Sequence, residues 1–461
     1  MTTPLLLHFQ SRQQSIEERL AAGKKIREKF PRIQQGYYKQ AVNRVDPVSV
    51  LEEQAKTRLA ELVPIRYARM LTSPFAFLRG GAAIMAADLA AGETTGINVQ
   101  ACGDMHVANF GIFGSAERNL IFGINDFDET LPGPWEWDLK RLVASIVASG
   151  RFLGAGENLC KEGVMAAVRS YRNRMKEYAY MGHMELHYAT IDEKHVLKAM
   201  PAHQAQIKKM MDKARTRTQI QVLGKLTDIV DDKYRFLDDA PLIVHETHSQ
   251  AGRPIEEAIA LWLASYFPSL LDDRKTLLTH YRIVDVARKV VGVGSVGTRC
   301  WIVFLTGNNS KDPLFLQVKE AQASVLESFV SKSVYTNHGQ RIVAGQRLLQ
   351  GAPDIFLGWG EQDGIHYYVR QLRDMKGGVQ FVPGKTDTDN IPAYSELCGW
   401  ALALAHAKSG DAAIITGYVG NSDELDEALV RFAVAYAGQN EKDYEALVAA
   451  KKSGRIQVET S

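Results

Sequence analysis

A single block of strand-forming sequence lies between two long helical regions, and this arrangement constrains the fold more than any other feature. Five runs within the block are dense in β-branched and aromatic residues, which favour strands. They are residues 283–291, 299–305, 314–319, 355–358 and 365–372. Turn-forming residues at 306–310 and at Asp363-Gly364 separate neighbouring runs, and a helix is predicted within residues 339–350. We therefore expect a small antiparallel sheet that carries one helix.

The segments on either side of this block follow helical periodicity. Before the block, the helical stretches are residues 14–30, 48–72, 82–91, 137–152 and 162–178. After Pro392, residues 397–404 again place their apolar side chains on one helical face. The sequence thus predicts an α+β fold with a helical lobe over residues 1–280 and a β-rich lobe over residues 281–377. A helical segment over residues 378–461 is expected to complete the larger lobe.

Composition excludes several classes of partner and compartment. Fifty-five basic and fifty-three acidic side chains leave a formal charge of +2, which argues against a nucleic-acid-binding protein. The four cysteines are far apart and form no C-x-x-C pair, so we expect neither a disulfide framework nor a zinc site, and a reducing cytoplasm fits. No run approaches 18 consecutive apolar residues, so no membrane span is expected.

The densest polar cluster, residues 103–111, reads GDMHVANFG, and Asp126-Phe127-Asp128 follows a strand-like run. Phosphoryl transfer from a nucleotide needs one carboxylate to orient the acceptor hydroxyl, a role that suits Asp104. It also needs oxygen ligands for Mg²⁺, which Asn109, Asp126 and Asp128 offer. Two alternatives stay open: a helix-capping turn, and a two-metal phosphoesterase built on Asp104-Met105-His106. The second needs a later Gly-Asn-His-Glu segment, and the sequence has none.

A second motif, Gly292-Val293-Gly294-Ser295-Val296-Gly297, has the spacing G-x-G-x-x-G. A dinucleotide-binding turn of this form is followed by a helix, but residues 298–305 are strand-like. A glycine loop between two strands instead predicts that its backbone amides lie over nucleotide phosphates, with Gly292, Gly294, Ser295 and Gly297 in contact. The next strand ends in Lys319, which is expected to bind the same phosphates. Alternatively, the loop is a flexible hairpin and Lys319 an exposed strand lysine.

Four longer motifs resemble a bacterial family known as domain of unknown function 2252, and the similarity covers nearly the whole chain. The motifs are GDMHVANFG at 103–111, NDFDE at 125–129, WDLKRL at 137–142 and SPFAFLRG at 73–80. That family is grouped with protein-kinase-like folds. Arg79, in the last motif, is assigned either to a structural ion pair or to contact with substrate or phosphate.

More distantly, GDMHVANF resembles the H-G-D-x-H-x-x-N loop of aminoglycoside and choline phosphotransferases. The resemblance implies that Asp104 is the catalytic base, Asn109 a metal ligand and Asp126 the principal metal ligand. Asp138 resembles the aspartate that braces this loop from the following helix. One departure is Cys102, which stands where the relatives have histidine. This difference puts the rigidity of the loop in doubt but not its chemistry.

The order of these motifs differs from that of a kinase, in which the glycine loop precedes the catalytic loop. Here the loop that resembles the catalytic one lies at 103–111 and the glycine loop at 292–297. Residues 397–411 resemble the helix that directly precedes the catalytic loop in phosphotransferases. Moving the block 281–411 in front of residues 100–180 restores the familiar order. We therefore expect a circularly permuted kinase-like fold with a small antiparallel β lobe and a large helical lobe.

Two details of the expected nucleotide site follow from the kinase resemblance. A helix carboxylate normally positions the strand lysine, and Glu327 is the first candidate partner of Lys319. Glu320, or no ion pair at all, are the alternatives. The hinge between the lobes is expected to place Gln371 and Leu372 beside the adenine.

The expected function is phosphoryl transfer from Mg-ATP to an unidentified small molecule or protein. Two alternatives use the same fold: a nucleotide-binding pseudokinase that regulates without turnover, and a nucleotidyl transferase that moves AMP. Acceptor pockets on one fold are built from variable loops, so the motifs do not identify the acceptor.

Overall fold

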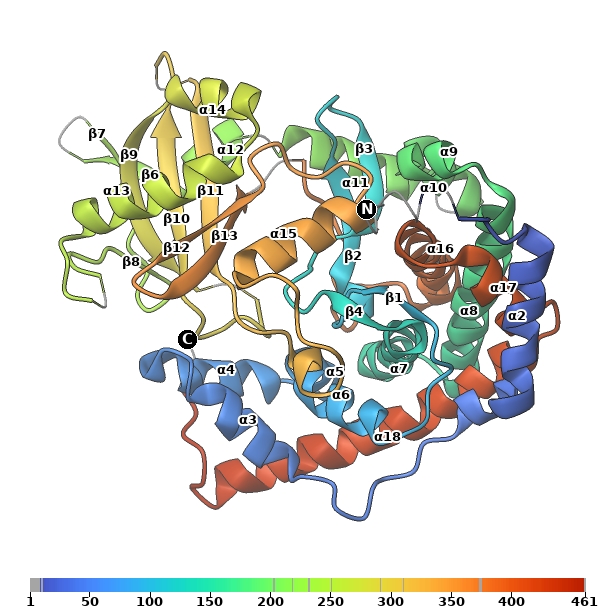
Figure 1. Ribbon diagram of the computed structural model, residues 1–461. Helices are drawn as coiled ribbons and strands as arrows, with labels where there is room; N and C mark the ends of the chain where they lie inside the picture. The colour runs from blue at the N-terminus through green and yellow to red at the C-terminus, as the bar shows by residue number, and fades with distance from the viewer. Residues whose placement is uncertain are drawn as a thin grey trace, which may run out of the picture.

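The computed structural model describes residues 9, 11–201, 204–217, 219–230, 233–249, 251–290, 292–309, 311–372 and 375–459. Val291, expected at the end of a strand, and Ser310, expected in a turn, lie outside the described residues. The chain has a mixed α+β architecture in which small antiparallel sheets accompany many helices (Figure 1). None of the helices in the described ranges combines the length and the apolar character needed to cross a membrane.

The largest sheet has six antiparallel strands in the order β12-β13-β11-β10-β9-β8. The strands are β8 (Ile243–Val244), β9 (Arg282–Lys289), β10 (Cys300–Thr306), β11 (Pro313–Glu320), β12 (Gly358–Gln362) and β13 (Ile365–Gln371). Four of the five predicted strands and the hairpin turn at Asp363-Gly364 are confirmed. The prediction for 355–358 was wrong, because that strand begins only at Gly358 and runs to the turn.

Helices cover both faces of this sheet. On one face lie α13 (Ile255–Tyr266) and α14 (Asp272–Thr279), where Trp262 and Tyr266 pack with apolar residues of β10 and β11. On the other face, α12 (Gln219–Leu226) packs against β11, and α15 (His338–Leu349) confirms the helix predicted within 339–350. Helices α12, α13 and α14 thus precede residue 281 in the sequence and bury apolar side chains on the sheet.

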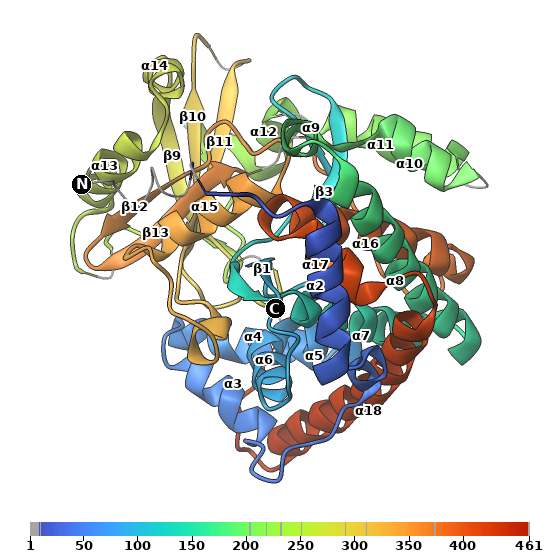
Figure 2. The ribbon, with the colours of Figure 1, turned by 45° about the vertical axis from the view of Figure 1, so that its right-hand side comes forward.

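A helical unit is built from both ends of the chain. Its elements are α2 (Ile16–Lys29), α7 (Trp135–Leu153), α8 (Glu157–Tyr180), α16 (Ile391–Ser409), α17 (Ala412–Val419) and α18 (Glu424–Lys452). Helix α7 is buried along almost its whole length and packs against α8, α16 and α18. The N-terminal helix α2 lies beside α17 in both views (Figures 1 and 2). Within the helical segment expected at 378–461, the last element is one continuous helix, α18.

Two smaller sheets, largely unforeseen in the sequence, lie between the helical unit and the large sheet. One pairs β1 (Asn98–Ala101) with β4 (Leu131–Pro134). The other places β3 (Leu120–Ile124) between β2 (Phe110–Gly114) and β5 (Ile191–Asp192). Of these strands only β3 was predicted. The remaining described pair is β6 (Thr227–Val230) with β7 (Lys233–Phe236).

The other helices cover the sides of this assembly. They are α3 (Pro47–Ala55), α4 (Val63–Met70), α5 (Pro74–Gly80), α6 (Ala82–Ala90), α9 (His183–Tyr188), α10 (Glu193–Ala199) and α11 (Gln204–Thr216). Between α4 and α5, the Ser73 hydroxyl accepts from the Ala76 amide and caps the start of α5. Figure 1 shows α3 and α4 below the large sheet, next to α5 and α6.

A buried arginine joins the N-terminal part of the chain to the C-terminal helix. Arg44 donates to Asp88 on α6 at 2.6 and 2.8 Å and to Asp443 on α18 at 2.8 and 2.6 Å. The Arg44 side chain is only 7% exposed and each carboxylate 4%. Each charge is thus paired within hydrogen-bonding distance, which offsets the cost of removing it from water.

Arg44→Met leaves Asp88 and Asp443 buried without a cation. We expect the variant to lose about 3–5 kcal/mol of unfolding free energy, measured by urea denaturation at pH 7. The matched control is Arg455→Met, whose side chain is 40% exposed and pairs with Asp46 and Glu52. The control is expected to lose only about 0–1 kcal/mol. Equal losses in the two variants would show that burial does not govern the strength of these pairs.

Candidate active site

The two small sheets bring the polar clusters at 103–111 and 125–129 together. Strand β2 begins directly after the short 3₁₀ turn Val107–Asn109, and its Phe110 pairs with Ile124 at the end of β3. The Asn125 amide donates to the Asn109 carbonyl at 2.8 Å. Asn109 and Asp126 therefore lie at the same end of one hairpin, as two ligands of one metal ion would require.

Asp138, in the first turn of α7, binds the backbone of the loop before this hairpin. Its carboxylate accepts from the Cys102 amide at 2.6 Å and from the Gly103 amide at 2.9 Å. A ring nitrogen of His406, on α16, lies 3.2 Å from the same carboxylate. These contacts give Asp138 the bracing position that the resemblance implied, so loop rigidity does not depend on a histidine at 102. The sequence analysis missed His406, although a lone histidine on a buried apolar helix is a visible signal.

Gly103 is required by the local backbone. Its φ is +80°, in the left-handed region that favours glycine. A Cβ at this position would lie 2.5 Å from the Glu129 carbonyl oxygen. The loop therefore packs directly on the segment that follows Asp126.

Asp104 lies beside a buried cation and a buried imidazole. One carboxylate oxygen is 2.5 Å from Arg141 of α7, and the other is 3.9 Å from the His106 ring. Burial raises the pKa of Asp104 even though the Arg141 guanidinium opposes the shift. Burial, aided by the nearby arginines 79 and 141, lowers the pKa of His106 well below its ordinary value, so the ring is neutral at pH 7. A carboxylate with a raised pKa suits a general base.

The glycine motif forms the connection between the antiparallel strands β9 and β10, and no helix begins in residues 292–300. The preceding N-terminal helices hold this loop in place. The Leu59 amide donates to the Gly297 carbonyl at 2.8 Å, and Arg69 donates to the Gly292 carbonyl at 3.3 Å. Val296 is completely buried against leucines 59 and 62 and an isoleucine of α4. The helices around residue 60 therefore fix one side of the loop, a contact that the sequence did not indicate.

Lys319, near the end of β11, forms an ion pair with Asp128, and the Tyr368 hydroxyl donates to the same carboxylate at 2.7 Å. Burial alone would raise the pKa of Asp128, but Lys319 and the two hydrogen bonds hold it below its ordinary value. The expected partners were wrong. Glu320, adjacent on the strand, points away and pairs with Arg299 at 3.0 Å. Glu327 lies 3.9 Å from Arg341.

Arg341, on α15, connects the sheet unit to the acidic segment. It donates to the Thr130 carbonyl at 2.6 Å and to the Asp128 and Gln322 carbonyls at 2.8 Å each. Its side chain is 2% exposed. Sequence reasoning missed this residue, because one arginine on an amphipathic helix resembles any solvated side chain.

One cavity of about 940 Å³ lies between the acidic clusters and the glycine loop. Of the residues predicted for the site, those that line it are Asp104, Asn109, Asp126, Asp128, Gly292, Gly294 and Ser295. Lys319 reaches its wall through Asp128, and Gly297 lies against Arg58. The structure thus brings together two sets of residues that are far apart in the sequence.

Gln371 and Leu372 do not line this cavity. The Gln371 side chain donates to Asp354 at 3.0 Å and lines a separate cavity of about 150 Å³. Leu372 packs in an apolar cluster with Phe236 and Phe315. Helix α12 packs against β11 here, and its Gln219 side chain donates to Gln371 at 3.4 Å.

The oxygen atoms around Asp126 fit a magnesium ion. Asn109 uses its side-chain NH₂ on the Asp104 carbonyl at 2.6 Å, which leaves its amide oxygen for a cation. Asp126 accepts one long hydrogen bond, from the Asp128 amide at 3.4 Å. Mg²⁺ is usually held by one or two carboxylates together with substrate phosphates. Within the described ranges, no group of three His, Cys, Asp or Glu side chains forms a metal cage.

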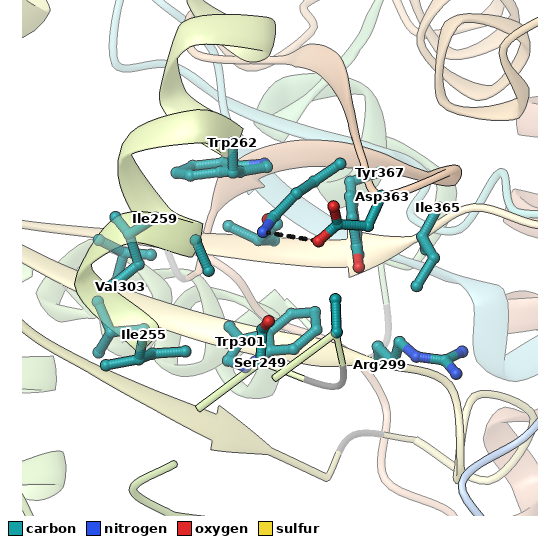
Figure 3. A pocket seen from close by; sticks show the side chains of 15 residues that line it. Ser249, Ile255, Ile259, Trp262, Arg299, Trp301, Val303, Asp363, Ile365 and Tyr367 are labelled. Carbon is teal, nitrogen blue, oxygen red and sulfur yellow. Dashed lines mark hydrogen bonds between the residues drawn. The ribbon is translucent and has the colours of Figure 1, made fainter. Parts of the chain in front are cut away.

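A second cavity, of about 250 Å³, lies on the outer face of the sheet beneath α13 (Figure 3). Its walls are mainly apolar, with Trp262 and Ile259 from the helix and Trp301 from β10. The Asp363 carboxylate at its edge accepts from Gln362 at 3.5 Å. Among the described residues, its lining has one carboxylate, Asp363, and lacks the cluster of carboxylates that lines the larger cavity.

Asp138→Asn is expected to loosen the loop at 102–104, because the two backbone N–H groups donate to different carboxylate oxygens and asparagine replaces one of these acceptors by an NH₂ donor. The unpaired buried donor is expected to cost about 1–3 kcal/mol of unfolding free energy. Hydrogen–deuterium exchange provides a local measurement: the Cys102 and Gly103 amides should exchange faster, while amides of α18 keep their rates. Unchanged exchange at both loop amides would contradict the bracing role.

The comparisons with known proteins now bear on this geometry. A family model described as an uncharacterised protein conserved in bacteria (DUF2252) matches residues 58–450. Neither a curated protein nor a solved structure matches the chain. The matched region contains the loop at 103–111, the acidic segment, the glycine loop and Lys319. The chain therefore belongs to the bacterial DUF2252 family.

Proposed function

We propose that the protein is a Mg-ATP-dependent phosphotransferase with a circularly permuted kinase-like fold. The observation that carries this proposal is the meeting of two distant segments across one cavity. Lys319 of the sheet pairs with Asp128, while Asp104 and Asp126 line the same cavity as the glycine loop. A nucleotide triphosphate bound there would contact the loop amides, the lysine and a metal ion at the same time.

The permuted order is supported by contacts at the junction that it requires. The Gln100 amide on β1 donates to the Ser409 hydroxyl, at the end of α16, at 3.2 Å. His406, one turn earlier, meets Asp138 beneath the loop at 103–111. The end of α16 thus lies where the strand leading into the catalytic loop begins, although the two are 309 residues apart. In the proposed ancestral order they are connected directly.

Each residue has a definite part in the proposed reaction. Asn109 and Asp126 would hold Mg²⁺, which would neutralise charge on the triphosphate oxygens. The Lys319 ammonium, now paired with Asp128, would bind phosphate oxygens from the opposite side. Asp104 would orient the acceptor hydroxyl and take its proton as the oxygen bonds to the γ-phosphorus and the bond to ADP breaks.

One observation favours the alternative of a nucleotide-binding regulator. Arg141 lies 2.5 Å from Asp104 and stabilises its negative charge, which weakens the carboxylate as a base. Nucleotidyl transfer uses the same residues with the α-phosphate at the reacting position. Labelled ATP distinguishes the three functions.

Asp126→Ala is expected to abolish the magnesium dependence of ATP binding, because it removes the principal carboxylate ligand. Isothermal titration calorimetry with and without Mg²⁺ measures this. The wild type should bind ATP with the metal far more tightly than without it, since carboxylates and triphosphate otherwise repel each other. Unchanged Mg-ATP binding in the variant would contradict the metal assignment.

Asp104→Asn is expected to keep Mg-ATP binding and to lower turnover about 10²–10⁴-fold, the usual contribution of a positioned base. Transfer is measured with γ-labelled and α-labelled ATP in the presence of a bacterial metabolite extract. Label from the γ position alone supports phosphoryl transfer, and label from the α position supports nucleotidyl transfer. Binding without transfer of either label in the wild type would support the regulator instead.

A further inference from the structure

The N-terminal helices form one wall of the same cavity, and a set of cationic side chains lines this wall. They are Arg58, just after α3, Arg66 on α4 and Arg79 on α5. The proposed transfer chemistry uses none of them, and apart from Arg79 the sequence analysis did not single them out. Some of their hydrogen-bond donors are buried without a partner among the described residues.

Arg66 is a buried cation without a carboxylate partner in the described part of the chain. Arg66 is only 1% exposed. One terminal nitrogen of its guanidinium group donates to Gln54 at 2.8 Å and to the Gly80 carbonyl at 3.2 Å. Its Nε and its other terminal nitrogen have no hydrogen-bond partner there. Burial lowers the pKa of Arg66 well below its ordinary value, and the neighbouring Arg58 adds to the shift. An unpaired buried charge costs several kcal/mol.

Arg58 and Arg79, on the same wall, also have buried nitrogen donors without a partner among the described residues. Arg58 donates to the Val296 carbonyl of the glycine loop, but its Nε is buried without a partner among the described residues. The Arg79 Nε is likewise buried and unpartnered within the described ranges, where no carboxylate lies in ion-pair contact with the side chain. The structural ion pair considered for Arg79 is therefore not present there. Burial lowers the pKa of Arg79, and the negative charges of Asp104 and Asp126 oppose this shift.

Two other arginines with largely buried side chains have carboxylate partners within hydrogen-bonding distance, whereas the Arg341 Nε, 3.9 Å from Glu327, is buried without a hydrogen bond among the described residues. Arg44 has two carboxylates, Arg172 pairs with Asp423 and Asp426, and Arg341 binds three carbonyl groups. A guanidinium group offers parallel donors that match phosphate oxygens in geometry and charge. Three such groups on one wall match a dianionic phosphate better than a single carboxylate.

We infer that Arg58, Arg66 and Arg79 form a subsite for a phosphate group carried by the acceptor. That the phosphate belongs to the acceptor rests on the proposed function, whereas the binding of a phosphate group does not. In that function the glycine loop, Lys319 and the Asp126 metal site already bind the nucleotide phosphates. An acceptor anchored on the arginine wall would extend its hydroxyl across the cavity towards Asp104. The predicted substrate class is therefore a phosphorylated small molecule.

Thermal unfolding in inorganic phosphate, compared with sodium chloride of equal ionic strength, tests the subsite. Phosphate should raise the unfolding temperature of the wild type, and Arg66→Met should weaken phosphate binding at least about tenfold. In chloride, Arg66→Met should unfold near the wild-type temperature, because removing a buried charge without a carboxylate partner offsets the loss of its hydrogen bonds to Gln54 and Gly80. Arg44→Met is the matched control: it should be less stable but keep the full phosphate shift. Arg79→Met gives a second measurement at a less buried position, with the same loss of phosphate binding expected.

Wild-type protein that does not respond to phosphate would overturn the inference, as would an unchanged phosphate shift in both Arg66→Met and Arg79→Met. The source of the phosphate is tested by titrating inorganic phosphate at saturating Mg-AMP-PNP. Simultaneous binding, with an unchanged Mg-ATP affinity in Arg66→Met, supports an acceptor subsite. Mutually exclusive binding assigns the arginines to the nucleotide and overturns the acceptor assignment. If the wild type binds phosphate but not Mg-ATP, the proposed function fails while the anion subsite stands.

Discussion

The ion pair between Lys319 and Asp128 joins the sheet unit to the acidic hairpin, and the arrangement of the cavity depends on it. The two residues are 191 positions apart, and Tyr368 on the neighbouring strand adds a hydrogen bond to the same carboxylate. Arg341 reinforces the connection from α15 through three backbone carbonyls. Since Asp128 is two residues from Asp126, the same contacts determine how the proposed metal ligand faces the glycine loop. A nucleotide phosphate entering the cavity would compete with Asp128 for the lysine.

Features set by short stretches of sequence could be predicted. Alternation and turn residues identified the hairpin at Asp363-Gly364, and helical spacing identified α15 and α16. The polar clusters were also visible, because Gly103–Gly111 concentrates side chains that have few purely structural uses together. Residues that act through the backbone, such as Asp138, became visible only through the family resemblance.

Features set by packing between distant segments could not be predicted. Strands β1 and β4 have only four residues each, and β4 contains two prolines and a glycine, so their pairing depends on the surrounding structure. The partner of Lys319 depended on which side of β11 its side chain leaves, because alternation along the strand sends Glu320 to Arg299. The packing of α13 on the large sheet could not be predicted either, since its apolar face has the same pattern whether it covers a sheet or other helices.

Two groups of charged side chains with different chemistry stand out among the residues that line the cavity. Carboxylates 104, 126 and 128 gather near the hairpin, where a metal ion and a lysine would balance them. Arginines 58, 66 and 79 face them from the N-terminal helices, and two of the three contribute directly to the wall that holds the glycine loop. Direct pairing between the two groups would remove both costs of burial, yet Arg66 and Arg79 make no such pair among the described residues. A ligand that carries negative charge at one end and a reactive hydroxyl at the other would satisfy both groups at once. Keeping the carboxylates and the arginines apart costs free energy, and a site preorganised for a charged ligand would require this cost.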